Sequence, residues 1–224
     1  MLASDVMVSP VITVNAAATV GDVVQLLLKH GISAVPVVGD QGRLMGMVSE
    51  GDLTHRCEIG TSRQRSLLLR LLTGDSALAA DYVKAHATRV ADVMMRNVIV
   101  AAPEIPLDEL AMIMEKHGIK RVPIVQAGKL VGIVSRANLV QAIATGGAKL
   151  VIPIADRRIR NRLLAHLRAQ AWTQTSILNA TVRDGVVDLW GSSNSEAEKV
   201  AVRVAAQQTP GVRAVNNHIT LRHG

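Results

Sequence analysis

The stretch that decides the fold is Gly46-Met-Val-Ser-Glu-Gly-Asp-Leu53, which recurs later in the chain as Gly132-Ile-Val-Ser-Arg-Ala-Asn-Leu139. The residues upstream recur as well, since Asp5-Val-Met7 matches Asp92-Val-Met94. The offset between the copies is 87 residues at the upstream motif (92 − 5) and 86 at the downstream motif (132 − 46). Two copies of so long a unit indicate a duplicated subdomain, because solenoid arrays need three or more short repeats.

Each copy predicts a buried strand followed by the start of a helix. The apolar runs at 44–48 and 130–134 are typical of buried strands, and each holds a glycine that lets another backbone approach closely. Ser49 and Ser135 follow these strands, where a serine hydroxyl commonly caps a helix. A second interpretation is functional, because a helix N-terminus also binds phosphate and Asp52 would accept hydrogen bonds from ribose hydroxyls. Capping suffices for either serine alone, whereas the repetition in both copies favours a ligand site.

The repeated motifs resemble those of tandem CBS domains, which are named after cystathionine β-synthase. They are Asp-Val-Met, a helix ending in Lys-His-Gly-Ile, a Val-Pro-Val/Ile strand and Gly-x-Val-Ser-x-x-Asp/Asn-Leu, within residues 5–53 and 92–139. The resemblance implies an α+β fold in which two repeats pack pseudo-symmetrically around two clefts. In this family the clefts commonly hold AMP, ADP or ATP. The nucleotide-binding residues that we expect here are Thr13, Ala34, Val35, Pro36, Ser49, Asp52, Lys120, Arg121, Val122, Pro123, Ser135, Arg136 and Asn138.

Two differences between the copies predict that the clefts are unequal. Asn138 replaces Asp52, and a neutral amide holds ribose hydroxyls less strongly than a carboxylate does. Lys120, Arg121 and Arg136 stand where the first copy has no basic residue. Cations beside a phosphate-binding turn favour a polyphosphate, although surface charge on a basic chain explains them equally well. We therefore predict an AMP-type site in the first copy and a preference for ATP in the second.

The segment 156–222 predicts a separate small domain with the element order αββαβ. We expect Asp156 to cap its first helix, and the arginines of that helix to occupy the faces around an apolar stripe. A hairpin is expected to turn at Arg183-Asp-Gly185. A second helix over 195–208 and a last strand over 212–221 complete the order.

Two motifs in this segment, Asp184-Gly-Val-Val-Asp-Leu-Trp-Gly191 and Pro210-Gly-Val-Arg-Ala-Val-Asn216, resemble those of a BON domain. The resemblance implies an interaction module, for which phospholipid binding is the usual proposal in exported proteins. The first repeat begins by Asp5, which leaves no room for an export signal. A protein partner therefore competes with anionic phospholipid as the expected partner of this segment.

The predicted organisation has four parts. They are a first CBS repeat (1–57), a helical linker or insert (58–89), a second CBS repeat (90–147) and a BON-like domain (156–222). The insert holds two apolar stretches that predict short helices. It serves either as a linker packed on the repeats or as a surface for a partner.

Composition limits the classes of function. The formal net charge is +7, and the residues from Asp156 onward hold ten Lys and Arg against five acids. Nucleic acid is nevertheless not expected as a partner, because Phe is absent and the aromatic residues are Tyr82, Trp172 and Trp190. No apolar run is long enough for a transmembrane helix. The single Cys57 cannot form an internal disulfide, which favours the cytoplasm.

The sequence contains no catalytic signature. It lacks the nucleophile elbow, the P-loop and the zinc-protease motif, and its seven histidines are scattered without ligand spacing. We therefore predict a homodimeric regulatory protein that is not an enzyme, with an adenine nucleotide as regulatory ligand and neither a metal nor a catalytic cofactor. The alternative is a peripheral membrane or scaffold protein with vestigial clefts, in which residues 156–222 bind phospholipid or a protein.

Overall fold

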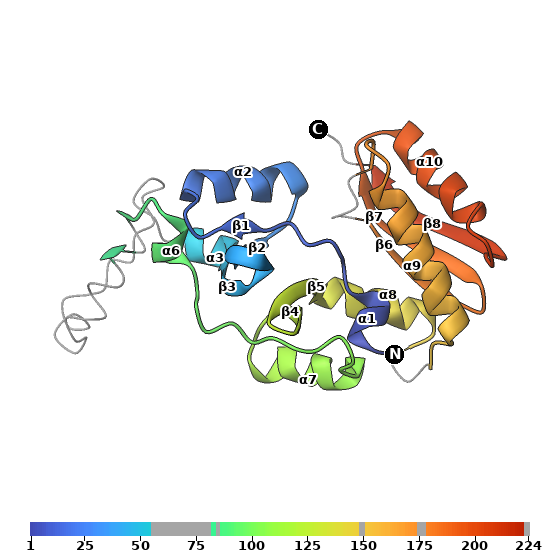
Figure 1. The fold of residues 1–224 in the computed structure, drawn as a ribbon, viewed down its shortest axis with the longest axis horizontal. Coiled ribbons are helices and arrows are strands. Elements are labelled where there is room, and N and C mark those ends of the chain that lie inside the picture. The colour runs from blue at the N-terminus through green and yellow to red at the C-terminus, as the bar shows by residue number, and fades with distance from the viewer. Residues whose placement is uncertain (55–81, 84–85, 148–150, 174–177, 222–224) are drawn as a thin grey trace. The chain divides into compact units, whose positions relative to one another are not determined.

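The computed structural model describes residues 1–54, 82–83, 86–147, 151–173 and 178–221. The chain forms two compact units, which Figure 1 shows in one ribbon. We call Ile12–Val98 the first-repeat unit, and Met1–Val11 together with Ile99–Gly224 the second-repeat unit. The predicted insert 58–89 lies outside the described residues for most of its length. Within the described ranges, no helix has both the length and the apolar character needed to span a membrane.

The first-repeat unit is built on a three-stranded sheet. The strand order is β1-β2-β3, with β1 parallel and β3 antiparallel to the central β2. Fully buried valines from the sheet, such as Val35 and Val48, pack with Val23 and Val93 from the helices. The elements are β1 (Val14–Asn15), α2 (Val20–His30), β2 (Ala34–Val38), the 3₁₀ turn η1 (Asp40–Gly42), β3 (Leu44–Ser49), α3 (Glu50–Leu53) and α6 (Val90–Val93).

Local sequence signals set both ends of α2. The Thr19 hydroxyl accepts a hydrogen bond from the Asp22 N–H at 3.1 Å, and the Thr19 N–H donates to the Asp22 carboxylate at 2.8 Å. This reciprocal pair is a capping box, which satisfies backbone donors at the helix start. Gly31 ends the helix with φ of 59°, a left-handed conformation that glycine adopts without strain.

The second repeat has the same plan in the second-repeat unit. Its strands β4 and β5 form an antiparallel pair, and buried Leu107, Leu110 and Met114 of α7 pack against them. The elements are α1 (Ala3–Val6), α7 (Leu107–Lys116), β4 (Arg121–Gln126), β5 (Lys129–Ser135) and α8 (Arg136–Thr145).

The predicted close backbone approach at the strand glycines is present in both units. Val8 pairs with Ile133 of β5 through two backbone hydrogen bonds of 2.9 and 3.1 Å, and Met7 lies against Gly132. A Cβ on Gly46 of β3 would lie 2.7 Å from the sulfur of Met94. The Asp5 motif, which precedes the first repeat in the sequence, thus packs on β5 of the second repeat. The Asp92 motif packs on β3 of the first repeat, so the two repeats exchange these segments.

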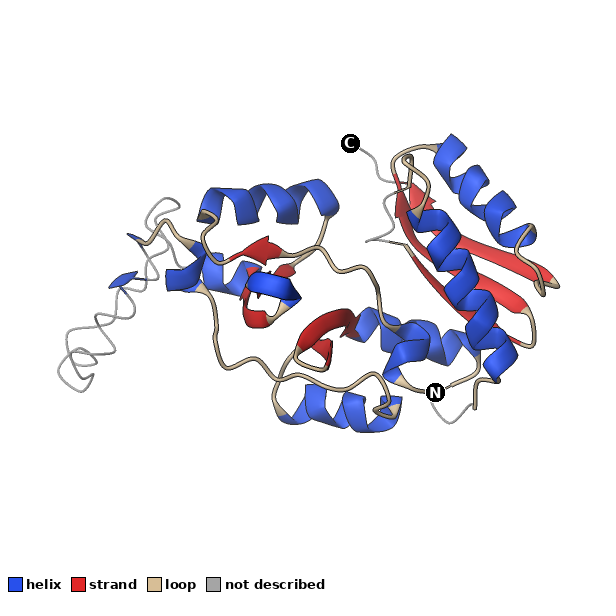
Figure 2. Cartoon of the chain, viewed as in Figure 1, coloured by secondary structure: helices blue, strands red, loops and turns tan. Residues whose placement is uncertain are grey.

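The C-terminal domain has the predicted order αββαβ. Strands β6, β7 and β8 form one sheet in that order, with β7 antiparallel to β6 and parallel to β8. Figure 2 shows the two helices of this domain beside its sheet, and alternate residues of the strands pack against them in one core. The elements are α9 (Ile154–Arg168), β6 (Asn179–Arg183), β7 (Val186–Ser193), α10 (Glu196–Gln207) and β8 (Ala214–Leu221). The predicted α+β class is confirmed.

One expectation for α9 was wrong. Asp156 does not cap the helix, because α9 begins at Ile154 after Pro153, and Asp156 lies in the first turn. Its buried carboxylate accepts hydrogen bonds from the backbone N–H groups of Asp184 and Gly185 at 2.8 and 3.0 Å, and so holds the hairpin turn. Of the arginines around the apolar stripe of α9, Arg160 is buried.

Candidate functional site

Each repeat places a serine and a polar side chain three residues later in the same local geometry. In the first repeat, Ala34 on β2 lies opposite Ser49 on β3. In the second repeat, Arg121 on β4 lies opposite Ser135 on β5. The residue after each serine is hydrogen-bonded through its backbone to the residue that precedes the partner strand. In the first repeat, this bond runs from the Glu50 N–H to the Ser33 carbonyl, at 3.0 Å. The repeated sequence therefore produces a repeated site.

In the first repeat, the Asp52 carboxylate has one oxygen bound to Ser49 and one that bonds to none of the described residues. Its Oδ2 accepts hydrogen bonds from the Ser49 N–H at 2.9 Å and from the Ser49 hydroxyl at 2.7 Å. No described residue bonds to Asp52 Oδ1, and the side chain is half-buried. The site thus presents an uncommitted carboxylate oxygen in a fixed position.

In the second repeat, the oxygen of the corresponding amide and one of its N–H groups are engaged. Asn138 Oδ1 accepts from the Ser135 N–H and from the Ser135 hydroxyl, both at 2.8 Å. Its Nδ2 donates to Gln141 Oε1 at 3.1 Å. Asn138 is only 4% exposed. The residue that we expected to contact ribose is therefore buried, with its amide oxygen and one of its two amide N–H groups already bonded.

The other predicted nucleotide-binding residues divide between walls and exposed cations. Lys120 and Arg136 are exposed, and Arg121 is half-buried beside Ser135. Thr13 is half-buried and immediately precedes β1. The buried wall residues are Ala34, Val35, Pro36, Val122 and Pro123. The first-repeat residues lie in one unit and the second-repeat residues in the other, so the structure presents two separate groups.

A polar network continues from Asn138 into the C-terminal domain. Gln141 Oε1, which accepts from Asn138, also accepts from Nδ2 of Asn179 on β6 at 3.2 Å. The same Asn179 nitrogen donates to the Val6 carbonyl at 2.8 Å. One turn further along α8, the Thr145 hydroxyl bonds to the Thr181 hydroxyl at 2.8 Å. The face of α8 that holds Asn138 is therefore the face on which β6 docks.

Arg160 of α9 joins this docking surface from the other side. Its guanidinium donates to the carbonyls of Ala180, Ser4 and Met7 at 2.6, 3.1 and 2.7 Å, and to Asn179 Oδ1 at 3.0 Å. Burial lowers the pKa of Arg160 to about 10, because desolvation disfavours the charged form. One buried side chain thus ties the N-terminal segment to the C-terminal domain.

A neighbouring ion pair strengthens the same contact. Arg157 Nε donates to Asp5 Oδ1 at 2.7 Å, and the Asp5 side chain is 3% exposed. Sequence reasoning missed this role for Asp5 and for both arginines. The available signal was their spacing, because positions 157, 160, 164 and 168 fall on one face of a helix.

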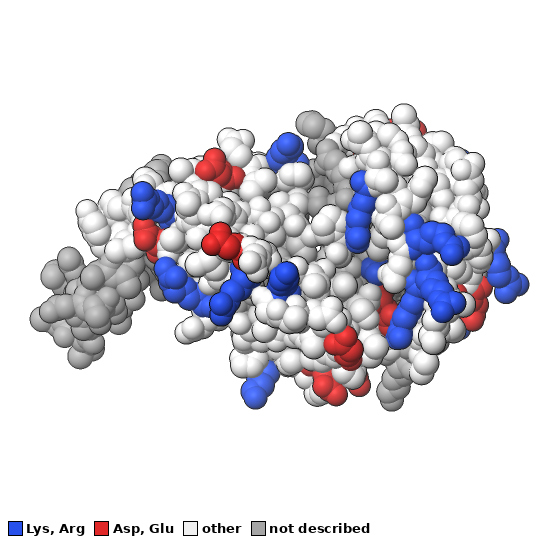
Figure 3. Space-filling view, in the orientation of Figure 1, with Lys and Arg blue, Asp and Glu red and all other residues white. Residues whose placement is uncertain are grey.

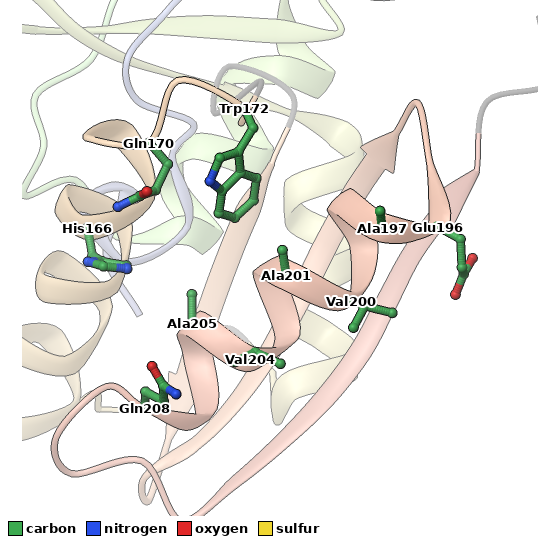
Figure 4. A pocket seen from close by; sticks show the side chains of 10 residues that line it. All are labelled: His166, Gln170, Trp172, Glu196, Ala197, Val200, Ala201, Val204, Ala205 and Gln208. Carbon is green, nitrogen blue, oxygen red and sulfur yellow. The ribbon is translucent and has the colours of Figure 1, made fainter.

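The C-terminal domain also carries a shallow groove of about 670 Å³ between α9 and α10. Figure 4 shows Trp172 projecting toward the small side chains of α10. Trp172, Val200 and Val204 are exposed, so the groove is largely apolar. Among the described residues, no group of three or more His, Cys, Asp or Glu side chains is arranged to hold a metal ion.

Comparisons with known proteins bear out both resemblances. The family model for the CBS domain matches residues 3–58 and 90–145, and the model for the BON domain matches residues 155–223. An uncharacterized protein of Methanocaldococcus jannaschii is 36% identical over 154 residues, which are 64% of this chain and 91% of that protein. L-aspartate semialdehyde sulfurtransferase of the same organism is 27% identical over 139 residues, which are 62% of this chain and only 22% of the sulfurtransferase. The crystal structure of CBSX2 in complex with AMP has a TM-score of 0.57 and 26% identity, over 65% of this chain and 97% of that chain.

Proposed function

Because the chain belongs to the CBS-domain family and ends in a BON domain, we propose that it is a non-catalytic regulatory protein that binds adenine nucleotides. The observation that carries this proposal is the Asp52 carboxylate, which Ser49 holds in place with one oxygen uncommitted. A carboxylate in this state accepts charge-assisted hydrogen bonds from ribose hydroxyls. The AMP bound in the similar CBSX2 structure supports an adenosine ligand.

The two repeats are assigned different ligands. The first repeat is the AMP-type site, with Ser49 and Asp52 at the ribose and Thr13 and residues 34–36 as its walls. In the second repeat, Lys120, Arg121 and Arg136 supply cations for the phosphates of ATP. Because Asn138 is buried with its oxygen and one N–H group bonded, we propose that a ligand reaches the Asn138 amide by displacing its bond to Gln141.

This displacement provides a route to the BON domain as output. Gln141 accepts hydrogen bonds from both Asn138 and Asn179, so a ligand that moves Gln141 also disturbs the docking of β6. Linkage then requires the reverse effect, in which a docked BON domain weakens ligand binding at the second repeat by the same factor. Nucleotide at the second repeat is thus read out as release of the BON domain.

Calorimetric titration of the full chain with AMP and with ATP tests the assignment. We expect Asp52→Ala to weaken AMP binding about tenfold or more, since a hydrogen bond to a charged group contributes about 1.5–3 kcal/mol. Asp40→Ala, which removes an exposed carboxylate from the same unit, is the matched control and should leave AMP binding unchanged. Arg136→Ala should weaken ATP far more than AMP. Absence of heat with every nucleotide, or two sites lost equally by either variant, would refute the proposal.

Tryptophan emission tests the output. Trp190 donates its indole N–H to the Thr181 hydroxyl at 3.0 Å, and Thr181 bonds to Thr145 of α8, so this indole adjoins the docking surface. In a Trp172→Phe background, Trp190 is the sole tryptophan. We expect ATP to change its emission, and Gln141→Ala to reduce that change. An emission that ATP leaves unaltered would contradict the release of the BON domain.

The burial of Asn138 also favours the alternative of a scaffold protein in which this cleft is vestigial. In that case the BON domain binds a protein or anionic phospholipid, and the apolar groove beside Trp172 is its exposed surface. No thermal shift with nucleotides, together with a Trp172 emission change on adding anionic vesicles at low salt, would select this alternative. For either function we propose a homodimer, and sedimentation showing a monomer with and without nucleotide would exclude it.

A further inference from the structure

A second cavity, of about 440 Å³, lies in the second-repeat unit between the N-terminal segment and α9. Its volume falls in the range of small-molecule sites, roughly 300–1,000 Å³. One wall is α9, and the other is formed by residues 4–9 with the hairpin end of β4 and β5. Its lining residues include Ser4, Met7, Val131, Arg157, Asn161 and Arg168.

The charge of this cavity is strongly positive. Arg157, Arg160 and Arg168 all line it, and Asp5 is the single acid among its described lining residues. Three guanidinium groups against one carboxylate leave an excess of two positive charges. Figure 3 shows basic side chains gathered over the region that α9 occupies in Figure 1. The cavity therefore favours a ligand with two negative charges.

Most of the donors on its two accessible arginines are uncommitted. A guanidinium carries five N–H groups. Among the described residues, Arg168 makes one hydrogen bond, from Nη2 to the Ser9 carbonyl at 2.7 Å. Arg157 uses two N–H groups on Asp5, at 2.7 and 3.3 Å. The side chains of Ser4 and Asn161 make no hydrogen bond with any described residue, and so add neutral donors.

The surroundings explain why an anion would be stabilised here. All four acceptors of Arg160 are neutral oxygens, and burial lowers its pKa to about 10. A buried cation without a full countercharge is costly, and a nearby anion offsets that cost. Met7 and Val131 supply apolar surface beside the donors, which gives room for an organic group.

We propose that this cavity binds a phosphate monoester, with the phosphate held by the guanidinium groups that line it, Arg168 among them, and the organic part against Met7 and Val131. A phosphate monoester carries nearly two charges at neutral pH, which matches the excess in the cavity. Guanidinium groups bind phosphate in the bidentate geometry that their fixed N–H directions favour. The ligand would contact both the N-terminal segment and α9, and would therefore strengthen the docking of the BON domain. This site is independent of the Asp52 site.

Calorimetry on the full chain with glycerol 3-phosphate, at constant ionic strength, tests the proposal. We expect one site per chain, and binding about tenfold weaker in Arg168→Gln, the scale of one charged hydrogen bond. Arg158→Gln is its matched control, because Arg158 is exposed on the same helix outside the cavity. Equal weakening by both variants would overturn the proposal, since it would indicate a general charge effect.

A second variant keeps the test valid if Arg168→Gln disturbs folding. Asn161→Asp adds a carboxylate to the cavity without removing a hydrogen bond, and should weaken the ester. Asn97→Asp makes the same chemical change at an exposed position of the first-repeat unit, and should not. Binding that is insensitive to Asn161→Asp would place the ester elsewhere and refute the assignment.

The same phosphate chemistry occurs in a soluble metabolite and in the headgroup of phosphatidic acid. Heat with glycerol 3-phosphate assigns the soluble source. Co-sedimentation with phosphatidic acid vesicles, lost in Asn161→Asp, assigns the headgroup if the soluble ester gives no heat. The proposal would be overturned if the soluble ester gave no heat and the chain did not co-sediment with the vesicles.

Discussion

Replacement of Arg160 should be among the most damaging single changes in the second-repeat unit. This side chain is 5% exposed and makes four hydrogen bonds of 2.6–3.1 Å, two to β6 and two to the N-terminal segment. Removing one partner from a buried charged network costs about 3–5 kcal/mol, because the remaining polar groups lose their partners. Whole domains are stable by only about 5–15 kcal/mol. We therefore expect Arg160→Ala to remove about a fifth or more of the free energy of unfolding.

Urea unfolding followed by tryptophan fluorescence is a suitable measurement, because both tryptophans lie in the BON domain. Arg160→Lys keeps the charge, but an ammonium has three donors, so it loses at least one of the four bonds. We expect it to be destabilised by about 1.5–3 kcal/mol, less than the alanine variant. The control is Arg158→Ala on the same helix, which should stay within about 0.5 kcal/mol of the parent chain. Equal midpoints for Arg160→Ala and Arg158→Ala would show that the network contributes nothing.

Three further substitutions test other parts of the fold. Gly46→Ala should lower the free energy of unfolding by about 1–3 kcal/mol in a thermal melt, because its Cβ would lie 2.7 Å from the Met94 sulfur. Gly51→Ala is the control and should be tolerated, because the nearest atom to its Cβ is 3.6 Å away. Hydrogen bonds from the N-cap residue of α2 lower the pKa of Asp22 below 3.8, so this carboxylate stabilises the fold above that pH and loses its effect as the pH falls. The stability difference between Asp22→Asn and the parent chain should accordingly shrink on acidification. Asp156→Ala should cost about 1–3 kcal/mol and speed hydrogen exchange at the two turn amides that it holds, while unchanged exchange there would contradict its role.

The sequence predicted the repeated fold well because local rules agree with the global arrangement. Thr19 and Gly31 limit α2, and the strand glycines mark close backbone approach, as capping and packing rules require. The αββαβ order of the C-terminal domain followed from turn residues and from hydrophobic spacing. These signals lie within a few residues of the structure that they determine.

The docking of the BON domain could not be predicted in the same way. Three of the four acceptors of Arg160 are backbone carbonyls, and every residue has one, so they leave no mark on the sequence. The exchange of Asp52 for Asn138 was visible in the sequence, and the two side chains differ in burial and in hydrogen-bond partners in the structure. The burial of Asn138 was not visible, because the network around it depends on Asn179, a residue 41 positions further along the chain (179 − 138).

The two Asp-Val-Met motifs are identical in sequence, yet their aspartates differ in their surroundings. Asp5 is buried against Arg157, whereas Asp92 is exposed. The length of the chain connection explains why the BON domain lies on the Asp5 motif. Nine residue steps separate the end of α8 from the start of α9 (154 − 145), and they span at most about 30 Å. This short connection keeps α9 close to the second repeat. The Asp5 motif packs on the same repeat. Such a tether also keeps the local concentration of the BON domain high, which favours its docked state.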